Sequence, residues 1–489
     1  MMTESPNGPP LLTAADLNQI HDASMAILDS PGMRIQSPRL RQALGQAGAK
    51  VDGAAEVVRF PSRLIEDTLQ GMRRDIKAGR HQIVLNGVVA SRTPRAMGAK
   101  FGGACIEVYD WPSRSVRTPS RADLIRFVQL GEALPEVAVV GNPVMYVRED
   151  DGRAVDPRLQ RVKTAALVAR HTTKAGSTEV WNAHELRYLM ALGEIVRGSR
   201  EAYLARPCFV TAKETISPLV LEADAGDVLL LLAEAGLPCT IIPMPITGGS
   251  TPLSLAANIA LGNAEILGTC AALRAACPTA NCVGGVISGT LDMRTGGAVF
   301  SGPEAVLQDL GLAEVHERLY GFDFGIGGYI DGKFPGAQAA LEVMARFGSL
   351  ARSGRYNVPV GLLNAGKRFS PEMALVGLEI ERWIVELAKG IEVGPETLRV
   401  EQVRKVGIAG HSMGEEHTRE FMRRNVWYPQ LMDRTLSSDT AQESAREMVE
   451  TASRKVREFL VRPDLYRAEG AMARAIDEVE QAAERELTA

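Results

Sequence analysis

The chain has few aromatic residues and no excess of basic charge. Aromatic residues make up 5% of its 489 residues, and its formal net charge at pH 7 is −4. Proteins that bind single-stranded nucleic acid stack the bases on aromatic side chains, and clustered Lys and Arg attract DNA or anionic membranes. We therefore expect neither a nucleic-acid partner nor a membrane partner.

Metal-binding patterns are also missing. The six cysteines form no Cys-x-x-Cys pair, and His411 and His417 lack the i, i+4 spacing of two metal ligands on a helix. We interpret the cysteines as buried thiols and predict no bound metal. The sequence also shows no signal peptide and no apolar run of membrane-spanning length, so we expect a cytoplasmic location.

What the chain does contain is the patterning of a large soluble core, with 45% hydrophobic and 23% charged residues. Residues 1–125 combine helix signals with short β signals. Thr13 is placed to cap a helix, a second helix pattern follows from Ser37, and residues 51–60 alternate as a hairpin does. We interpret this part as a mixed α+β portion packed on the next domain.

Residues 126–436 alternate strand and helix patterns with the spacing of βα units, roughly 30 to 45 residues. No Gly-x-Gly-x-x-Gly follows the first strand, and there is no Walker loop. An α/β fold is therefore predicted, as a TIM (β/α)8 barrel rather than a doubly wound sheet. The predicted strands are Val137–Met145, Arg206–Ala212, Pro238–Pro245, Ala280–Ile287, Phe322–Gly327 and Val358–Leu363, and the predicted helices are Ser217–Ala235, Ser254–Cys277, Pro303–Tyr320, Gly336–Ser353 and Pro371–Gly390.

Residues 437–489 are charged and follow a helical pattern in two segments, Ala441–Leu460 and Tyr466–Leu487. We interpret them as a C-terminal helical extension that packs on the barrel or joins copies of the chain. A homo-oligomer is the expected assembly.

The segment Gly325–Lys333 reads Gly-Ile-Gly-Gly-Tyr-Ile-Asp-Gly-Lys and lies between a predicted strand and a predicted helix. A barrel keeps its chemistry at such strand-to-helix loops. Other segments with Gly, polar and charged residues occur in similar settings. They are residues 243–252, 292–305, 364–372 and 410–434.

In this order, the segments resemble those of the trimethylamine methyltransferase family, whose signature has the form Gly-x-Gly-Gly-x-x-Asp-x-Lys. Members that act on trimethylamine carry pyrrolysine where this chain has Ile326, which has no electrophilic imine. The chain is therefore similar to the pyrrolysine-free branch, which includes glycine betaine methyltransferases. The resemblance implies transfer of a methyl group from a quaternary amine to Co(I) of a corrinoid.

The resemblance also implies that the corrinoid (a cobalamin) is carried by a separate partner protein. The chain has no Asp-x-His-x-x-Gly cobalt-ligand motif of its own. The residues that we expect to contact the corrinoid are Gly327, Gly328, Lys333, His411 and His417. For the histidines, the alternative is a structural role.

A quaternary ammonium has no N–H donor, so aromatic faces and carboxylates must hold it. Tyr329, in the central motif, is the aromatic residue that we expect to do so. Asp292 is a candidate for the cation and Arg294 for a substrate carboxylate, with an internal Asp–Arg pair as the alternative. The remaining substrate candidates are Asp331, whose alternative is a loop salt bridge with Lys333, and Gly248, Gly249, Ser250 and Thr251, whose alternative is a tight turn with a helix cap.

Two departures from the family pattern leave another function open. Leu362 stands where many relatives have the histidine of a His-Gly-Ala-Gly stretch, and Glu415 and Glu416 replace a more neutral stretch. The alternatives are a catalytically degenerate amine-binding or scaffold protein of the same fold, and an enzyme with another methyl donor and acceptor.

Because neither the cysteines nor the histidines have ligand spacing, methyl transfer should need no added metal. Dialysis against EDTA is expected to leave the rate of methylcobalamin formation unchanged. Complete loss of that rate, restored by zinc, would contradict this prediction.

Overall fold

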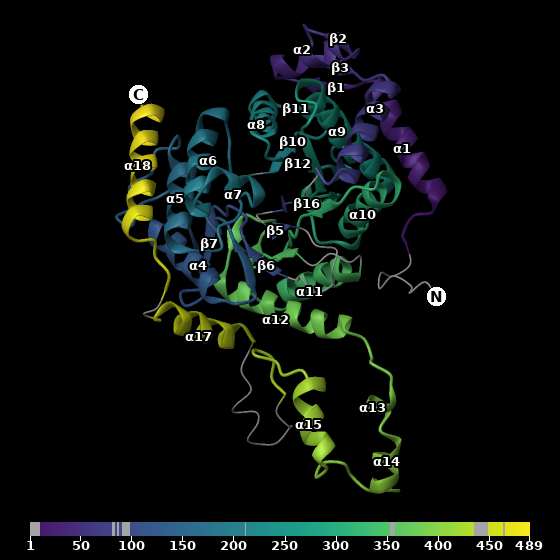
Figure 1. The fold of residues 1–489 in the computed structure, drawn as a ribbon, viewed down its shortest axis with the longest axis vertical. Coiled ribbons are helices and arrows are strands. Elements are labelled where there is room, and N and C mark those ends of the chain that lie inside the picture. The colour runs from purple at the N-terminus through teal and green to yellow at the C-terminus, as the bar shows by residue number, and fades with distance from the viewer. Residues whose placement is uncertain are drawn as a thin grey trace.

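The computed structural model describes residues 10–80, 84–85, 88–89, 98–210, 212–352, 357–434, 448–462 and 465–489. The N-terminal portion begins with three helices, seen at the upper right of Figure 1. Thr13 and Asp16 form a reciprocal capping box, and Ser37 caps the second helix. The predicted cap at Thr13 is thus confirmed, and so is the start of the second helix at Ser37. The helices are α1 (Ala14–Asp29), α2 (Pro38–Gln46) and α3 (Ser62–Lys77).

The predicted hairpin within residues 51–60 is confirmed by the antiparallel pairing of β2 (Lys50–Asp52) with β3 (Val57–Arg59). This hairpin extends to β1 (Met33–Ile35), which pairs in parallel with β11 (Val220–Leu221). The N-terminal portion is therefore bonded to a loop of the main domain, and α1, α2 and α3 pack on its helix α9.

The main domain contains a four-stranded parallel sheet in the order β10-β12-β14-β17. Its strands are rich in β-branched residues and are buried on the side that the helices cover. The bounds are β10 (Ala212–Thr215), β12 (Pro238–Pro243), β14 (Asn281–Val286) and β17 (Phe324–Ile326). The first of these starts where the predicted strand Arg206–Ala212 ends, because Phe209 has a left-handed φ of 54° and turns the chain there.

A second parallel sheet has the order β18-β6-β9, with β18 (Asn357–Pro359), β6 (Gly98–Phe101) and β9 (Val137–Val140). The backbone at Lys174–Gly176 joins the two sheets. The Val140 amide donates to the carbonyl of Lys174 at 2.8 Å, and the Phe209 amide donates to that of Gly176 at 2.7 Å.

These strands follow barrel order, each with a helix after it, and the α/β class is confirmed. The predicted closed ring is not: among the described residues, no ladder joins β17 to β18. The helices that follow the strands are α4 (Arg121–Ala133), α5 (Gln160–His171), α6 (Ala183–Arg197), α7 (Arg200–Ala205), α8 (Ala223–Glu234), α9 (Leu255–Ala276), α10 (Pro303–Glu314) with the π-helical η1 (Val315–Tyr320), α11 (Ala337–Arg352) and α12 (Pro371–Ala388).

Helix α9 corrects one expectation from the sequence. By length and composition it could cross a membrane, although no such run was expected. In the structure it lies in the core, against α1, α2 and α10. Its Glu265, fully buried, accepts hydrogen bonds from the Leu219 amide at 2.7 Å and from the hydroxyls of Thr215 and Ser217.

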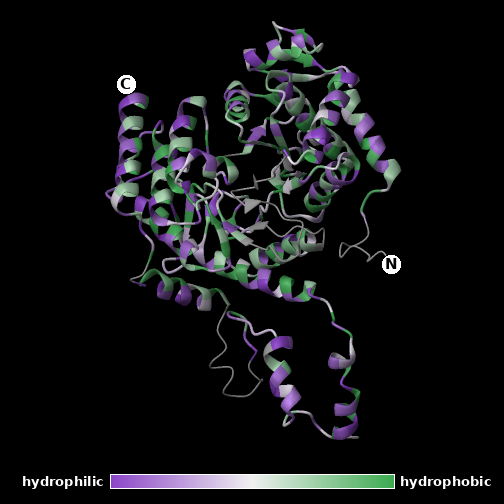
Figure 2. Ribbon diagram, in the orientation of Figure 1, coloured by the Kyte–Doolittle hydropathy of each residue, from purple (hydrophilic) through white to green (hydrophobic). Residues whose placement is uncertain are grey.

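The chain after α12 leaves the body as an arm, seen at the bottom of Figure 1, and returns to it. The arm carries α13 (Pro395–Leu398), α14 (Val400–Val406) and α15 (Glu416–Asn425), whose ribbons are largely hydrophilic in Figure 2. Helix α17 (Met448–Leu460) then packs on α12, and α18 (Gly470–Leu487) packs on α5 and α6. The expected boundary at residue 436 lies outside the described residues.

Short β elements in the loops complete the description. The antiparallel pairs are β7 (Glu107–Asp110) with β8 (Ser115–Arg117), β15 (Gly289–Asp292) with β16 (Gly297–Val299), β19 (Leu362–Leu363) with β20 (Arg368–Phe369) and β4 (Val84–Leu85) with β5 (Val88–Val89), and β13 (Ile246–Thr247) pairs in parallel with β15.

Arg161 of α5 and Glu185 of α6 form a buried ion pair, and their side chains are 3% and 1% exposed. Arg161→Met would leave the carboxylate of Glu185 buried without its cation. We expect this change to lower the free energy of unfolding by about 3 to 5 kcal/mol in urea titrations.

Arg158→Met is the matched control, because Arg158 pairs with Asp156 on the surface. It should cost less than about 1 kcal/mol. Equal effects of the two changes would argue against this role of the buried pair.

Candidate active site

The loop after β17 lies at the carboxyl ends of the parallel strands, and its glycines allow close contact with neighbouring strand ends. A Cβ atom on Gly327 would lie 2.3 Å from Ile287, and one on Gly328 would lie 2.3 Å from Pro359. Contacts this close leave no room for a side chain at either glycine. The two glycines, expected to contact the corrinoid, thus have a packing role as well.

A buried ion pair fixes this loop from behind. Arg346 of α11 and Asp309 of α10 are joined at 2.5 Å, and each side chain is 1% exposed. Arg346 also donates to the carbonyl oxygens of Gly327 at 2.8 Å and Phe300 at 3.1 Å, and Asp309 accepts from the Ser288 amide at 2.7 Å. Burial raises the pKa of Asp309 to about 6, and Arg346 opposes that rise. One pair therefore positions the loops that follow β14, β16 and β17.

Asp331 has a structural role in the same loop. Its carboxylate accepts from the amides of Phe300, at 2.9 Å, and Ser301, at 2.7 Å, and from the Ser301 hydroxyl at 2.5 Å. These bonds give Asp331 a structural role, and its predicted contact with the substrate remains a prediction. Lys333 is exposed at the end of the loop, and its carbonyl oxygen accepts from Arg368.

Tyr329 is half-buried between two neighbours. Its ring meets Phe300 edge-on, with centroids 6.0 Å apart, and lies against Gly366. A Cβ atom on Gly366 would be 2.6 Å from the ring, and that residue has a left-handed φ of 77°. Burial is the main cause that raises the pKa of the Tyr329 hydroxyl well above its usual range, and the charges of Glu179 and Glu214 add to the rise. The tyrosine thus lies near two carboxylates that were not predicted from the sequence.

Glu214 projects from the inner side of β10. Its register partner is Ile242, whereas the adjacent pair, Lys213 and Ile241, is buried on the other side of the strands. Burial raises the pKa of the Glu214 carboxyl even though the residue is solvent-exposed. The side chain of Glu214 is therefore accessible from the inner side of the strands, and this inner side at the strand ends is called the recess.

Glu179 faces the same recess from the segment after Lys174–Gly176. Burial is the main cause that raises the pKa of the Glu179 carboxyl to about 7, and the charge of Glu214 adds to the rise. The charge of Lys213 opposes it. The Lys213 ammonium donates to the carbonyl of Val180 at 2.9 Å, which anchors the segment. Glu214 lies two residues after the end of a predicted strand, and that position was the signal that could have identified it. No strand was predicted near Glu179.

The other substrate candidates lie on the small sheet β13-β15-β16. Arg294 is 89% exposed on its side chain and pairs with Asp292 at 3.2 Å, which is the internal pair considered as the alternative. The amides of residues 248–251 all donate to carbonyl oxygens within their own turn. The structure therefore supports the tight-turn interpretation and directs none of these donors at a ligand.

His411 and His417 lie on the arm, apart from the loop after β17 in Figure 1. His411 is exposed, and the ring of His417 stacks on Phe421 with centroids 4.4 Å apart. The structure does not bring these histidines to Tyr329 within one chain. Their predicted contact with a corrinoid remains a prediction.

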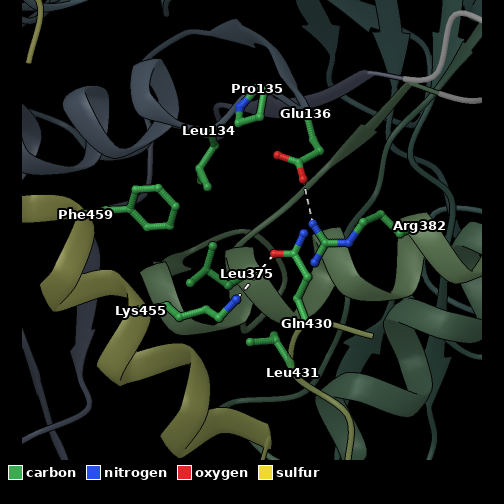
Figure 3. Close-up of a pocket in the computed structure, with 9 residues that line it drawn as sticks. All are labelled: Leu134, Pro135, Glu136, Leu375, Arg382, Gln430, Leu431, Lys455 and Phe459. Atoms are coloured by element: carbon green, nitrogen blue, oxygen red, sulfur yellow. Dashed lines mark hydrogen bonds and ion pairs between the residues drawn. The ribbon is translucent and has the colours of Figure 1, made fainter. Parts of the chain in front are cut away.

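A cavity of about 190 Å³ lies elsewhere, between α12, α17 and the turn before β9. Figure 3 shows its lining, including the ion pair of Glu136 with Arg382 at 2.7 Å. The turn precedes β9, so the cavity opens at the amino ends of the strands, where conserved barrel features serve stability rather than catalysis. We therefore place the candidate active site at Tyr329.

Comparison with known proteins assigns the chain to a family. Residues 5–484 match the family described as "Trimethylamine methyltransferase (MTTB)". The chain belongs to this family. It is therefore a member of a methyltransferase family, and the match extends from the N-terminal helices to the C-terminal extension.

Curated members of the family share about a quarter of its residues. Trimethylamine methyltransferase MttB of Desulfitobacterium hafniense is 25% identical over 442 residues, 89% of this chain and 86% of that protein. MttB of Methanosarcina barkeri strain Fusaro is 27% identical, over 92% of this chain and 90% of that protein. Glycine betaine methyltransferase of D. hafniense strain Y51 is 23% identical, over 91% of this chain and 90% of that protein. Among solved structures, the monomethylamine methyltransferase of M. barkeri matches with a TM-score of 0.45 and 14% identity, over 97% of this chain and 92% of that one.

The two carboxylates predict a pH dependence of cation binding. Glu179 is ionised above its pKa of about 7 and becomes neutral as the pH falls through that value. The affinity for tetramethylammonium should fall about fivefold between about pH 8 and about pH 6, which corresponds to about 1 kcal/mol of lost charge interaction. Calorimetric titration at both pH values measures it.

Glu179→Gln should remove most of this dependence, because the side chain can no longer ionise. Glu201→Gln, on the exposed face of α7, is the control and should retain it. A pH dependence that is unchanged in Glu179→Gln would refute the assignment.

Proposed function

We propose that the chain transfers a methyl group from a quaternary amine to the Co(I) corrinoid of a partner protein. The observation that supports the proposal is the half-buried ring of Tyr329, which packs on Phe300 and Gly366 after β17, together with the charges of Glu179 and Glu214 that raise the pKa of its hydroxyl. The curated relatives, named for trimethylamine and glycine betaine, support a methylated amine as the donor. Ile326, in place of pyrrolysine, favours the quaternary class.

The recess has the chemistry that a quaternary ammonium requires. Such a cation offers no hydrogen to a donor–acceptor network, so it is held by ring faces and by diffuse negative charge. Tyr329 supplies the ring, and the two carboxylates supply the charge. An anionic substrate without a cationic group would be repelled from the carboxylates.

The raised pKa of Glu179 matters for the rate as well as for binding. During transfer the methyl–nitrogen bond breaks, and its electron pair stays on nitrogen, which becomes a neutral tertiary amine. Two full negative charges at the ammonium would stabilise the substrate more than the transition state. At neutral pH Glu179 is only partly ionised, since its pKa is about 7. The site therefore attracts the cation with less than two full charges.

The corrinoid would be supplied by the partner and is a co-substrate of the chain. When bound, it supplies the Co(I) nucleophile that accepts the methyl group. The chain's own residues do the remaining work: Tyr329, Glu179 and Glu214 bind and orient the amine, and the loop at Gly327 and Gly328 forms one edge of the recess that a corrinoid would face. The absence of bulk at these glycines fits the approach of a large planar ring.

Tyr329→Ala tests the proposed contact. Loss of the ring should weaken binding of the quaternary amine that is turned over by about 1 to 2 kcal/mol, the magnitude of a desolvated cation–π interaction. Tyr329→Phe retains the ring and should bind within about twofold of the wild type. Calorimetry gives the affinities.

The substrate class is tested by following methylcobalamin absorbance with free cob(I)alamin. Quaternary amines should be demethylated, and trimethylamine should not. Efficient demethylation of trimethylamine, with all quaternary amines inert, would overturn the proposed function.

A further inference from the structure

A cavity lies away from the candidate active site, where the chain returns from the arm to the body. It is bounded by α12, α17, the turn before β9 and the segment at Gln430, and its volume is about 190 Å³. Apolar cavities of about 150 Å³ can bind a molecule of the size of benzene. Pro135 and Gln430 are exposed at its rim, so a small molecule can enter from solvent.

One wall of the cavity is apolar. Leu134, at the end of α4, and Leu375, of α12, are 4% and 5% exposed, and both line the cavity together with Phe459 of α17. Figure 3 shows the ring of Phe459 and the side chain of Leu134 on the same side of the cavity. A wall of this kind removes the apolar surface of a ligand from water, so it favours a molecule with an aliphatic portion.

The lining also contains a cation without a counter-charge. The ammonium group of Lys455 donates to the side-chain oxygen of Gln430 at a long distance of 3.4 Å, and among the described residues it has no ion-pair partner. The other cation of the lining, Arg382, is held by Glu136 and Glu379, each at 2.7 Å. Lys455 is therefore the lining residue that can receive an anionic group of a ligand.

Glu136 offers the opposite charge. One of its carboxylate oxygens accepts from Arg382, and the other has no hydrogen-bond partner in the described part of the chain. Figure 3 shows this carboxylate and the Lys455 ammonium at opposite sides of the cavity. A ligand with only a carboxylate would also face Glu136, and one with only an ammonium would also face Lys455, so each would meet a like charge. A ligand with one charge at each end avoids both repulsions.

We propose that this cavity binds a linear aliphatic amino acid whose ammonium and carboxylate lie at opposite ends of the chain. Its carboxylate accepts from Lys455, its ammonium donates to the second oxygen of Glu136, and its methylene groups pack on the apolar wall. The bound molecule contacts four segments that are distant in sequence, so it holds α17 and the returning chain on the body. This site is separate from the residues proposed for methyl transfer, and its test does not depend on that function.

Calorimetric titration of the full wild-type chain tests the charge separation. The probes are γ-aminobutyrate, δ-aminovalerate and ε-aminocaproate, each compared with its linear isomer that carries both charges at one end: α-aminobutyrate, norvaline and norleucine. The isomers have the same atoms and the same charges, so only the distance between the charges differs. The tightest of the three probes should bind at least about tenfold more tightly than its isomer, because the isomer reaches only one of the two charged residues.

Two substitutions test the residues separately, with pentylamine and pentanoate as probes that carry one charge each. Lys455→Met should weaken binding of δ-aminovalerate about 10- to 100-fold and that of pentylamine by less than about twofold. Glu136→Gln should weaken δ-aminovalerate similarly and leave pentanoate within about twofold, which also shows that the cavity still forms without the pair to Arg382. Lys389→Met, at an exposed lysine near the end of α12 that pairs with Glu386, is the control and should bind every probe as the wild type does.

Each outcome decides for or against the site. If the wild type binds none of the three linear amino acids, or binds them no more tightly than their isomers, the proposal is overturned. It is also overturned if Lys455→Met and Glu136→Gln weaken the singly charged probes as much as δ-aminovalerate. If either variant does not fold, the comparison of isomers with the wild type decides alone. None of these results changes the conclusion about methyl transfer.

Discussion

The ion pair between Asp309 and Arg346 is the interaction on which the candidate active site depends. The pair reaches the loops that follow β14, β16 and β17, through Ser288, Phe300 and Gly327 respectively. In a buried environment, such charges are stable only when nearly every donor and acceptor has a partner. Because the pair satisfies its donors and acceptors with the backbone of these loops, it holds the loop that carries Tyr329 in place.

The charges in the interior are of two kinds, those in close ion pairs and those without one. Arg161 with Glu185 and Arg346 with Asp309 are close ion pairs that serve the fold. Glu179 and Glu214 form no close ion pair with described residues, and burial raises the pKa of each carboxyl although the charge of Lys213 opposes the rise. Shifts of this kind in a recess mark functional groups more often than structural ones. The contrast between the two kinds of charge separates scaffold from site.

The arm is a different type of surface. Residues of α13 and α14 are nowhere buried, and Ile391, Val393 and Ile408 are among the most exposed large hydrophobic side chains of the described residues. Isolated helices of this length are marginal in water, because their stability comes from packing. The body encloses a core of apolar residues, whereas these three apolar side chains of the arm are open to solvent.

The sequence by itself determined the class of fold and most of the elements. Local signals were enough for the cap at Thr13, for the hairpin, and for the strands at β12, β14 and β17, since each depends on neighbours along the chain. The motif around Gly325–Lys333 likewise identified the loop and Tyr329. Only the tertiary structure decided which polar residues surround that tyrosine. Asp331 proved to be bonded to the backbone that follows β16, and Asp292 and Arg294 to each other. The charges that act on the Tyr329 hydroxyl come instead from Glu179 and Glu214, because strand register links residues distant in sequence and decides which side chains point inward.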